Sequence, residues 1–238
     1  MKRINCKGKT VLIIPDLHAP YHHPDALDFL RAIKKKYKPQ VITCLGDETD
    51  GHAISFHNSI SELLSAGDEL NKAIEFIQEL NKLFPKMYLV DSNHGSLRYR
   101  KLKHHGIPIA HLKSQKELYG TPKWNWYDEL ILNTHKGEVY VCHGRSSNGK
   151  KIVGELSMSV VQGHYHCLFG INWYSNGMQD RYALFSGALC DRQSMAFEYG
   201  KLFLSKPILG ASLITDDGTP RLIKMELNKK DRWTKYLP

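Results

Sequence analysis

Residues that can bind a metal ion or transfer a proton follow five apolar segments of this 238-residue chain, each where the segment ends. Imidazole, carboxylate and amide groups form a mixed nitrogen and oxygen ligand set suited to divalent cations. No cysteine belongs to these groups, which argues against a structural zinc site. In chain order, the groups are Asp16-Leu17-His18, Gly46-Asp47 with Asp50 close behind, Asp91-Ser92-Asn93-His94, His143-Gly144, and Gly163-His164-Tyr165-His166.

The segments before these groups have the pattern of buried strands, and helices separate the first three. Residues 9–15, 40–45 and 86–90 are continuous apolar runs. Residues 24–37 and 69–84 carry apolar side chains at helical spacing. Such alternation is typical of a mostly parallel sheet covered by helices. Because ligands bind at the carboxyl ends of strands in open sheets, we expect the polar groups to converge there.

The second half of the chain has a different pattern, with short strands in closer succession. The turn signals Asn176-Gly177 and Asp217-Gly218 separate some of them. We predict a second, mainly antiparallel sheet packed on the first, within a single domain that covers residues 1–238. The predicted strands are 130–133, 138–142, 159–162, 168–174, 182–186, 211–215 and 222–227.

Composition places the chain among ordinary globular proteins, with 42% hydrophobic and 24% charged residues. No apolar run is long enough to span a bilayer, and the first residues lack the apolar stretch of a secretory signal. We therefore expect a cytoplasmic protein with no membrane partner. The five cysteines are scattered without a C-x-x-C pair, which favours free thiols over a disulfide framework.

The formal net charge of +9 makes a polyanionic partner plausible without requiring one. Residues 98–105 (RYRKLKHH) form either a solvated basic helix face or a phosphate-contacting patch beside the predicted site. Arg98 and Arg100 are the better phosphate ligands of that segment, because guanidinium matches phosphate geometry. Arg145 begins a second basic stretch after His143. Residues 123–127 (KWNWY) suit a base-stacking surface, but we favour a strand.

The order D-x-H, G-D-x-x-D, N-H, H-G and G-H-x-H, over residues 16–166, resembles the motif series of calcineurin-like metallophosphoesterases. Each motif alone is weak, but five in order at strand ends are specific. The spacing looks most like compact phage-type and prophage-type members. The resemblance implies an α/β fold of two packed mixed β-sheets flanked by helices, which is a four-layer αββα sandwich.

The resemblance also implies two divalent metal ions, with Mn expected first and Fe, Zn, Ni, Mg or Co as alternatives. A metal-bridging hydroxide would attack the phosphorus atom, and His94 would stabilise the transition state or protonate the leaving group. Asp47 would bridge the two ions. Carried over by position, one ion would be held by Asp16, His18, Asp47 and His166, and the other by Asp47, Asn93, His143 and His164.

The sequence departs from the family pattern at two positions. Gly95 follows His94 where the family usually has Asp or Glu, so the carboxylate that orients the histidine is missing. Asp50 or Asp91 could replace it. In addition, Asp50 is followed by Gly51-His52 rather than Arg-Gly, which argues against a phosphoprotein phosphatase.

The sequence therefore favours a dinuclear metal-dependent phosphoric ester hydrolase that acts on a nucleotide or a similar small phosphate ester. Arg98, Arg100 and Arg145 are its candidate substrate contacts, and Asp47 and His94 its catalytic centre. The first alternative is a DNA or RNA nuclease of the same fold, favoured by the net charge. The second is a nucleic-acid-binding protein without catalysis. The sequence does not indicate the oligomeric state.

Overall fold

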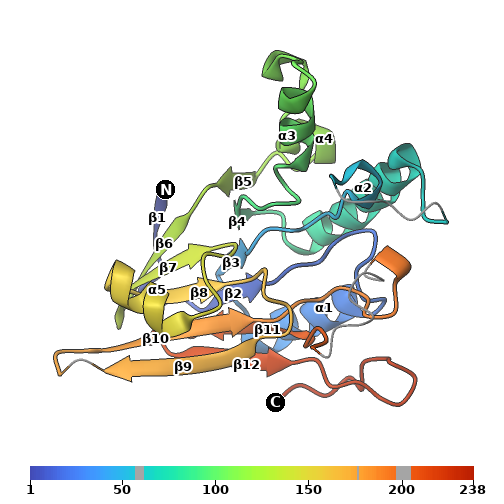
Figure 1. The fold of residues 1–238 in the computed structure, drawn as a ribbon. Helices are drawn as coiled ribbons and strands as arrows, with labels where there is room; N and C mark the ends of the chain where they lie inside the picture. The colour runs from blue at the N-terminus through green and yellow to red at the C-terminus, as the bar shows by residue number, and fades with distance from the viewer. Residues whose placement is uncertain (57–61, 176, 197–204) are drawn as a thin grey trace.

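Two six-stranded mixed sheets pack face to face in the computed structural model, which describes residues 1–56, 62–175, 177–196 and 205–238 (Figure 1). The first sheet has the order β12-β11-β2-β3-β4-β5, and the second has the order β1-β6-β7-β8-β10-β9. The first comprises β2 (Val11–Ile14), β3 (Val41–Cys44), β4 (Met87–Val90), β5 (Trp124–Tyr127), β11 (Gly210–Ile214) and β12 (Pro220–Lys224). The second comprises β1 (Lys2–Asn5), β6 (Leu130–Thr134), β7 (Gly137–Cys142), β8 (Ser159–Gln162), β9 (Phe169–Ser175) and β10 (Asp180–Ser186).

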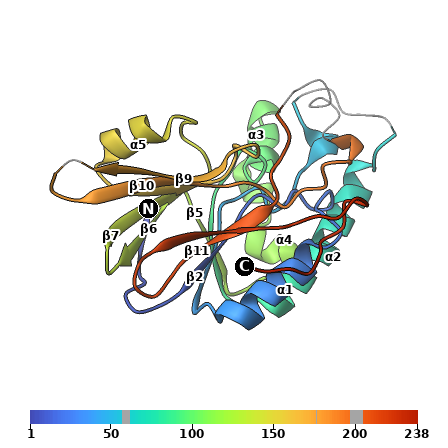
Figure 2. The same ribbon diagram turned by 90° about the horizontal axis from the view of Figure 1, so that it is seen from below.

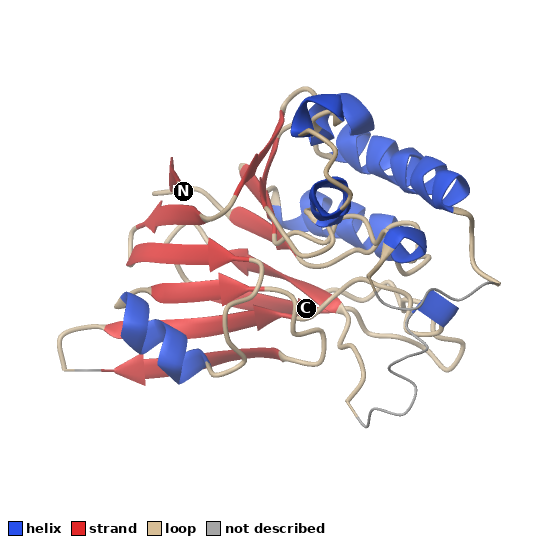
Figure 3. Ribbon diagram, turned by 45° about the horizontal axis from the view of Figure 1, so that its top comes forward, coloured by secondary structure: helices blue, strands red, loops and turns tan. Residues whose placement is uncertain are grey.

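Helices cover the outer faces of both sheets and complete the four layers that the sequence predicts (Figure 2). Helices α1 (Ala26–Tyr37) and α2 (Ala66–Leu83) pack on the first sheet, and α5 (Gly149–Leu156) packs on the second. Figure 3 shows α5 across the strands of the second sheet, while the other helices gather at the opposite side of the molecule.

Strand β2 shows why these segments read as continuous apolar runs. Val11 and Ile13 point into the core between the sheets, whereas Leu12 and Ile14 point toward the helices. All four are fully buried. Because successive side chains of a strand face opposite sides, a strand covered on both faces must be apolar at every position. The apolar run ends where the chain leaves the sheet, and the polar groups begin there.

Parallel pairing brings the ends of these strands together. In the first sheet β2, β3, β4 and β5 are successive parallel neighbours, and in the second sheet β7 is parallel to β8. The carboxyl ends of β2, β3 and β4 therefore form one edge, and those of β7 and β8 form another.

The prediction of a mainly antiparallel second sheet is wrong. Its β1–β6, β7–β8 and β8–β10 pairs are parallel, and only β6–β7 and β9–β10 are antiparallel. A helical crossover, α5, lies between β7 and β8, and a parallel pair needs such a connection. This helix was not predicted because lysines and glycines interrupt its apolar pattern in the sequence. Strands β11 and β12 join the first sheet instead, where β11 is antiparallel to β2.

Several smaller predictions have clear outcomes. Residues 123–127 contain a strand, β5, in which Trp124 is fully buried. All five cysteines are free thiols, and Cys167 alone among them is exposed. The antiparallel pair β9–β10 forms the predicted hairpin, although Asn176 of its turn lies outside the described residues. No helix in the described ranges is long and apolar enough to cross a membrane.

Short helices follow β4 and connect it to β5. Helix α3 (Leu97–His104) projects from the body of the molecule, with α4 (Gln115–Tyr119) beside it (Figure 1). The 3₁₀ turns η1 (His52–Ile54) and η2 (Ile109–His111) contact α3. The basic segment 98–105 is therefore helical over most of its length, and it begins a few residues after the predicted metal ligands.

Candidate metal centre

The predicted ligands converge from both sheets at the carboxyl edges of the parallel strands. Asp16 and His18 follow β2, Asp47 follows β3, and Asn93 follows β4. His143 follows β7, and the pair His164 and His166 follows β8.

One cluster contains Asp16, His18, Asp47 and His166, whose ligand atoms all lie within 4.8 Å of one another. His166 Nε2 lies 3.0 Å from Asp16 Oδ2 and 3.2 Å from His18 Nε2. Among the described residues, the buried atom Asp16 Oδ1 has no hydrogen-bond partner. Two imidazole nitrogens facing each other beside an unpartnered buried carboxylate oxygen fit a shared cation, which would satisfy all of them.

A second cluster contains Asp47, His143 and His164, with the amide of Asn93 beside it. His143 Nε2 lies 2.7 Å from Asn93 Oδ1, 3.2 Å from Asp47 Oδ2 and 3.2 Å from His164 Nδ1. Asp47 Oδ2 is also 3.6 Å from His18 Nε2 in the first cluster. The Asp47 carboxylate thus lies between both groups, as a bridging ligand must.

The backbone around these ligands adopts conformations that most residues avoid. His18, Asp47 and His164 have φ angles of 54°, 46° and 65°. Each such residue costs on the order of 1–3 kcal/mol and persists only where the surroundings enforce it. Here the backbone N–H groups of Leu17 and His18 both donate to the carbonyl of Asp47, at 3.0 and 2.8 Å. These hydrogen bonds join the loops after β2 and β3 and hold the side chains at the site.

Glycine is required at three positions where the loops of the site contact one another. A Cβ atom on Gly163 would lie 2.2 Å from Asp16 Oδ1, and one on Gly144 would lie 2.6 Å from His164 Cβ. Gly46 has φ +93°, and its Cβ would lie 3.1 Å from His143 Nδ1. These G-D, H-G and G-H motifs therefore keep glycine because the ligands fill the space beside it.

Burial and neighbouring charges shift the pKa values of two histidines of the site in opposite directions. Burial alone would lower the pKa of His143, but the Asp47 carboxylate outweighs it and raises the pKa to about 9. Burial and the neighbouring His143 lower the pKa of His164. Burial would raise the pKa of Asp47, but His143, His94 and His18 hold it well below its usual range. The site therefore keeps its central carboxylate ionised, as metal binding requires.

Comparison with known proteins agrees with this geometry. Residues 9–187 match the calcineurin-like phosphoesterase family. The chain belongs to this family. Vacuolar protein sorting 29 from Cryptosporidium parvum has a similar fold, with a TM-score of 0.51 and 15% identity over 93% of this chain and 92% of that one. The phosphoesterase Yfce from E. coli gives a TM-score of 0.48 and 10% identity over 94% and 96%. A search of curated protein sequences found no match.

In this protein Asp50 contacts both His18 and His94. It therefore takes the place of the orienting carboxylate that is missing at Gly95. Asp50 Oδ2 lies 2.8 Å from His18 Nδ1, and the Asp50 carbonyl lies 2.5 Å from His94 Nδ1. Because a carbonyl only accepts hydrogen bonds, Nδ1 of His94 carries the hydrogen and Nε2 remains available. No hydrogen bond or ion pair joins the described residues Asp91 and His94; the Asp91 N–H donates to Tyr127 O.

The three candidate arginines differ in how they lie. Arg100 donates from Nη2 to the carbonyl of Asn93, 2.5 Å away, and so lies directly beside the metal ligands. The guanidinium of Arg98 lies over the Tyr119 ring, 5.9 Å from its centroid. Arg145 forms an ion pair with Glu129, which compensates its charge. Arg100 is therefore the strongest of the three candidates for contact with a phosphate.

Two residues at the site were not predicted. Ser92 Oγ accepts the N–H groups of Asp47 and Gly95, both at 2.9 Å, and so fixes the bridging ligand relative to β4. Its only sequence signal is that serine stands where the family usually has glycine in G-N-H. Glu48 accepts a hydrogen bond from Trp126 Nε1 at 3.0 Å, and burial raises its pKa to about 7. Its position directly after Asp47 was the only sequence signal.

Replacing Gly163 with alanine is expected to lower Mn²⁺ affinity at least about tenfold, because the new Cβ must displace Asp16 from the first cluster. Equilibrium dialysis of Mn²⁺ measures the change. Gly154→Ala in α5 is the matched control, since nothing lies within 4 Å of a Cβ there. Wild-type affinity in Gly163→Ala would show that Asp16 is not a ligand.

Replacing Asp50 with alanine is expected to weaken Mn²⁺ binding about 10–100-fold, as the loss of a group that orients a ligand histidine does elsewhere. Asp91→Ala is expected to have a smaller effect, because Asp91 contacts neither His18 nor His94. The same dialysis compares both variants with the wild type. An equal loss in both would mean that general negative charge, and not the Asp50–His18 contact, supports the site.

Proposed function

We propose that this protein is a dinuclear metal-dependent phosphoesterase that hydrolyses a phosphate ester of a nucleotide. The observation that carries the proposal is the Asp47 carboxylate, which belongs to both ligand clusters. Asp16, His18, Asp47 and His166 would hold one cation, and Asp47, Asn93, His143 and His164 would hold the other. Carboxylate and imidazole ligands together suit Mn²⁺, and Fe, Zn, Ni, Mg or Co are compatible with the same set.

Hydrolysis forms a bond from phosphorus to a water oxygen and breaks the ester bond, and the departing oxygen takes up a proton. Two bound divalent cations lower the pKa of a water and neutralise charge on the phosphoryl oxygens. The protein itself must position the substrate and supply the proton, since phosphoryl transfer depends mainly on positioning and electrostatics.

His94 is well placed to supply that proton. Its side chain is 27% exposed and lies beside the bridging Asp47, whose Oδ1 accepts the His94 N–H at 3.1 Å. Burial would lower the pKa of His94, but Asp47 and Asp50 outweigh it and raise the pKa. With Nδ1 committed to the Asp50 carbonyl, Nε2 of the protonated ring is the donor.

The decisive assay removes all metal, restores Mn²⁺, and compares bis(p-nitrophenyl) phosphate with p-nitrophenyl phosphate. We expect Mn²⁺-dependent hydrolysis of at least one ester, and we expect Asp47→Asn to abolish it and to reduce Mn²⁺ binding from two ions per chain. Asp180→Asn, at an exposed position of β10, is the control. Faster diester cleavage favours a nuclease type and faster monoester cleavage a nucleotidase type. Bound Mn²⁺ without any turnover would favour the non-catalytic nucleic-acid-binding alternative.

Replacing His94 with alanine is expected to reduce kcat according to the leaving group. General acid catalysis contributes about 10²–10⁴-fold when the leaving oxygen needs a proton, and less when it is a stable anion. We therefore expect a larger loss with phenyl esters than with p-nitrophenyl esters of the same type. The test measures kcat of the wild type and of His94→Ala with the phenyl and the p-nitrophenyl ester, as monoesters and as diesters. An equal loss with both leaving groups would assign His94 to substrate positioning instead of proton donation.

A further inference from the structure

The segment from Gly95 to Lys116, here called the basic arm, is the most strongly charged surface near the metal centre. Its helix α3 stands out from the body of the molecule, away from both sheets (Figure 1). The sequence contains no carboxylate from Ser92 to Lys116. The same stretch contains six cations, which are Arg98, Arg100, Lys101, Lys103, Lys113 and Lys116.

Among the described residues, these cations lack the ion pairs that arginines elsewhere in the protein form. Arg3 pairs with Glu138, Arg31 with Asp28, and Arg232 with Asp25. Within the described part of the chain, no carboxylate comes within 4.0 Å of a cation of the basic arm. Arg98 and Lys101 are three positions apart on the helix, a spacing at which like charges destabilise it. A solvated helix face ordinarily interleaves both signs, so this arrangement favours a polyanionic ligand.

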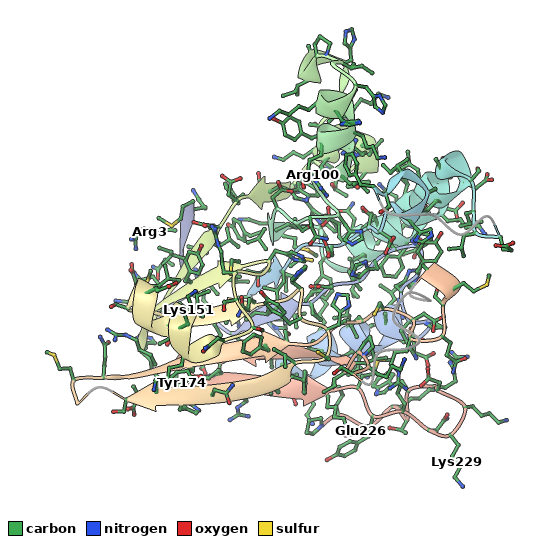
Figure 4. The ribbon with its side chains drawn as sticks, in the orientation of Figure 1. Arg3, Arg100, Lys151, Tyr174, Glu226 and Lys229 are labelled. Atoms are coloured by element: carbon green, nitrogen blue, oxygen red, sulfur yellow. The ribbon has the colours of Figure 1, made fainter. Side chains whose placement is uncertain are left out.

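The charge of the basic arm is continuous with the metal centre. Arg100 donates to the carbonyl of Asn93, and the amide oxygen of Asn93 contacts His143 within the second cluster. Figure 4 shows Arg100 where α3 leaves the body of the molecule. The whole of α3, eight residues long, spans roughly 12 Å at 1.5 Å per residue. A ligand that placed one phosphate at the metals could place others along the helix.

An aromatic side chain accompanies these charges. Tyr99 lies between Arg98 and Arg100 in sequence, and it is 38% exposed. Phe56, which is 47% exposed, lies beside the arm, with the Lys101 ammonium 4.2 Å from its ring centroid. Cations that track a phosphate backbone, together with an exposed ring on which a base can stack, are the features of a single-strand binding surface.

We infer that the basic arm binds single-stranded nucleic acid and presents one of its phosphodiester groups to the metal centre. The inference about the substrate rests on the proposed hydrolytic function, whereas the binding surface itself does not. Unpaired bases are required because a ring can stack only on an exposed base face.

The binding test uses a fluorescein-labelled 20-nucleotide single strand with the metal-free protein in EDTA, so that no cleavage occurs. The arm variant is Lys101→Gln/Lys103→Gln/Lys113→Gln. The control variant is Lys35→Gln/Lys229→Gln/Lys230→Gln, which removes the same charge from exposed positions, and Figure 4 shows Lys229 at the opposite end of the molecule from Arg100. We expect fluorescence anisotropy to show a loss of at least tenfold in affinity for the arm variant and less than twofold for the control.

The salt dependence of oligonucleotide affinity gives a second, independent measurement. If each of the three lysines contacts one phosphate, the slope of log K against log[salt] falls by about 2 in the arm variant. Tyr99→Ala is expected to weaken binding at least about fivefold through lost stacking. Equal losses in the arm and control variants would overturn the inference, because they would reflect net charge alone. Arm-dependent binding to anionic phospholipid vesicles without oligonucleotide binding would also overturn it.

The catalytic test measures kcat/KM of the Mn²⁺-loaded enzyme for the oligonucleotide and for bis(p-nitrophenyl) phosphate. We expect the ratio of the two to fall at least tenfold in the arm variant and to stay within twofold of wild type in the control. An unchanged ratio would overturn the substrate assignment. Arm-dependent oligonucleotide binding without hydrolysis of any ester would support the binding surface and count against the proposed function instead.

Discussion

A single buried carboxylate, that of Asp47, connects the parts of this site. Its oxygen atoms contact the backbone N–H of His94 and face the imidazoles of His18 and His143. These partners come from loops after β2, β4 and β7, so they belong to both sheets. An ionised carboxylate away from water is tolerated only with compensating positive charge. The packing of the two sheets and the chemistry of the centre therefore depend on each other.

The fold holds the candidate ligands close together through strained backbone at the ligands and tightly packed strands before them. The strands that end at the site are buried on both faces, and their side chains are held by tight packing. The positive φ angles of His18, Asp47 and His164 turn the chain sharply as it leaves the sheet. Gly144 and Gly163 allow the loops to approach within contact distance. Ligands at loop ends can therefore be positioned as accurately as strand residues.

The core of the fold and the convergence of the candidate ligands at one edge were predictable because each depended on local sequence. Continuous apolar runs marked the strands of the parallel core, and the polar residues after them marked its carboxyl edge. What failed depended on contacts distant in sequence. Strand β1 pairs with β6, more than 120 residues away, and nothing in its four residues indicates that partner. The crossover helix α5 is stabilised by packing on β10, which its own lysine-rich sequence does not reveal.

Contacts distant in sequence also decide which residues orient the candidate ligands. Whether Asp50 or Asp91 would support the histidines could not be decided from spacing, because both lie within a few residues of a ligand. The answer came from the turn at Gly51, φ +76°, and from contact between the loops after β2 and β3. Ser92 is similar, since a hydroxyl that accepts two backbone N–H groups looks like any other loop serine in the sequence.

Opposite charges are separated across the surface where a substrate would bind. The proposed ligand set contains two carboxylates, Asp16 and Asp47, and Asp50 contacts the ligand candidate His18. Two divalent cations would carry more charge than these three carboxylates together. Attraction at longer range must then come from charge that does not depend on metal loading. The basic arm supplies such charge immediately beside the site, without carboxylates of its own that would cancel it.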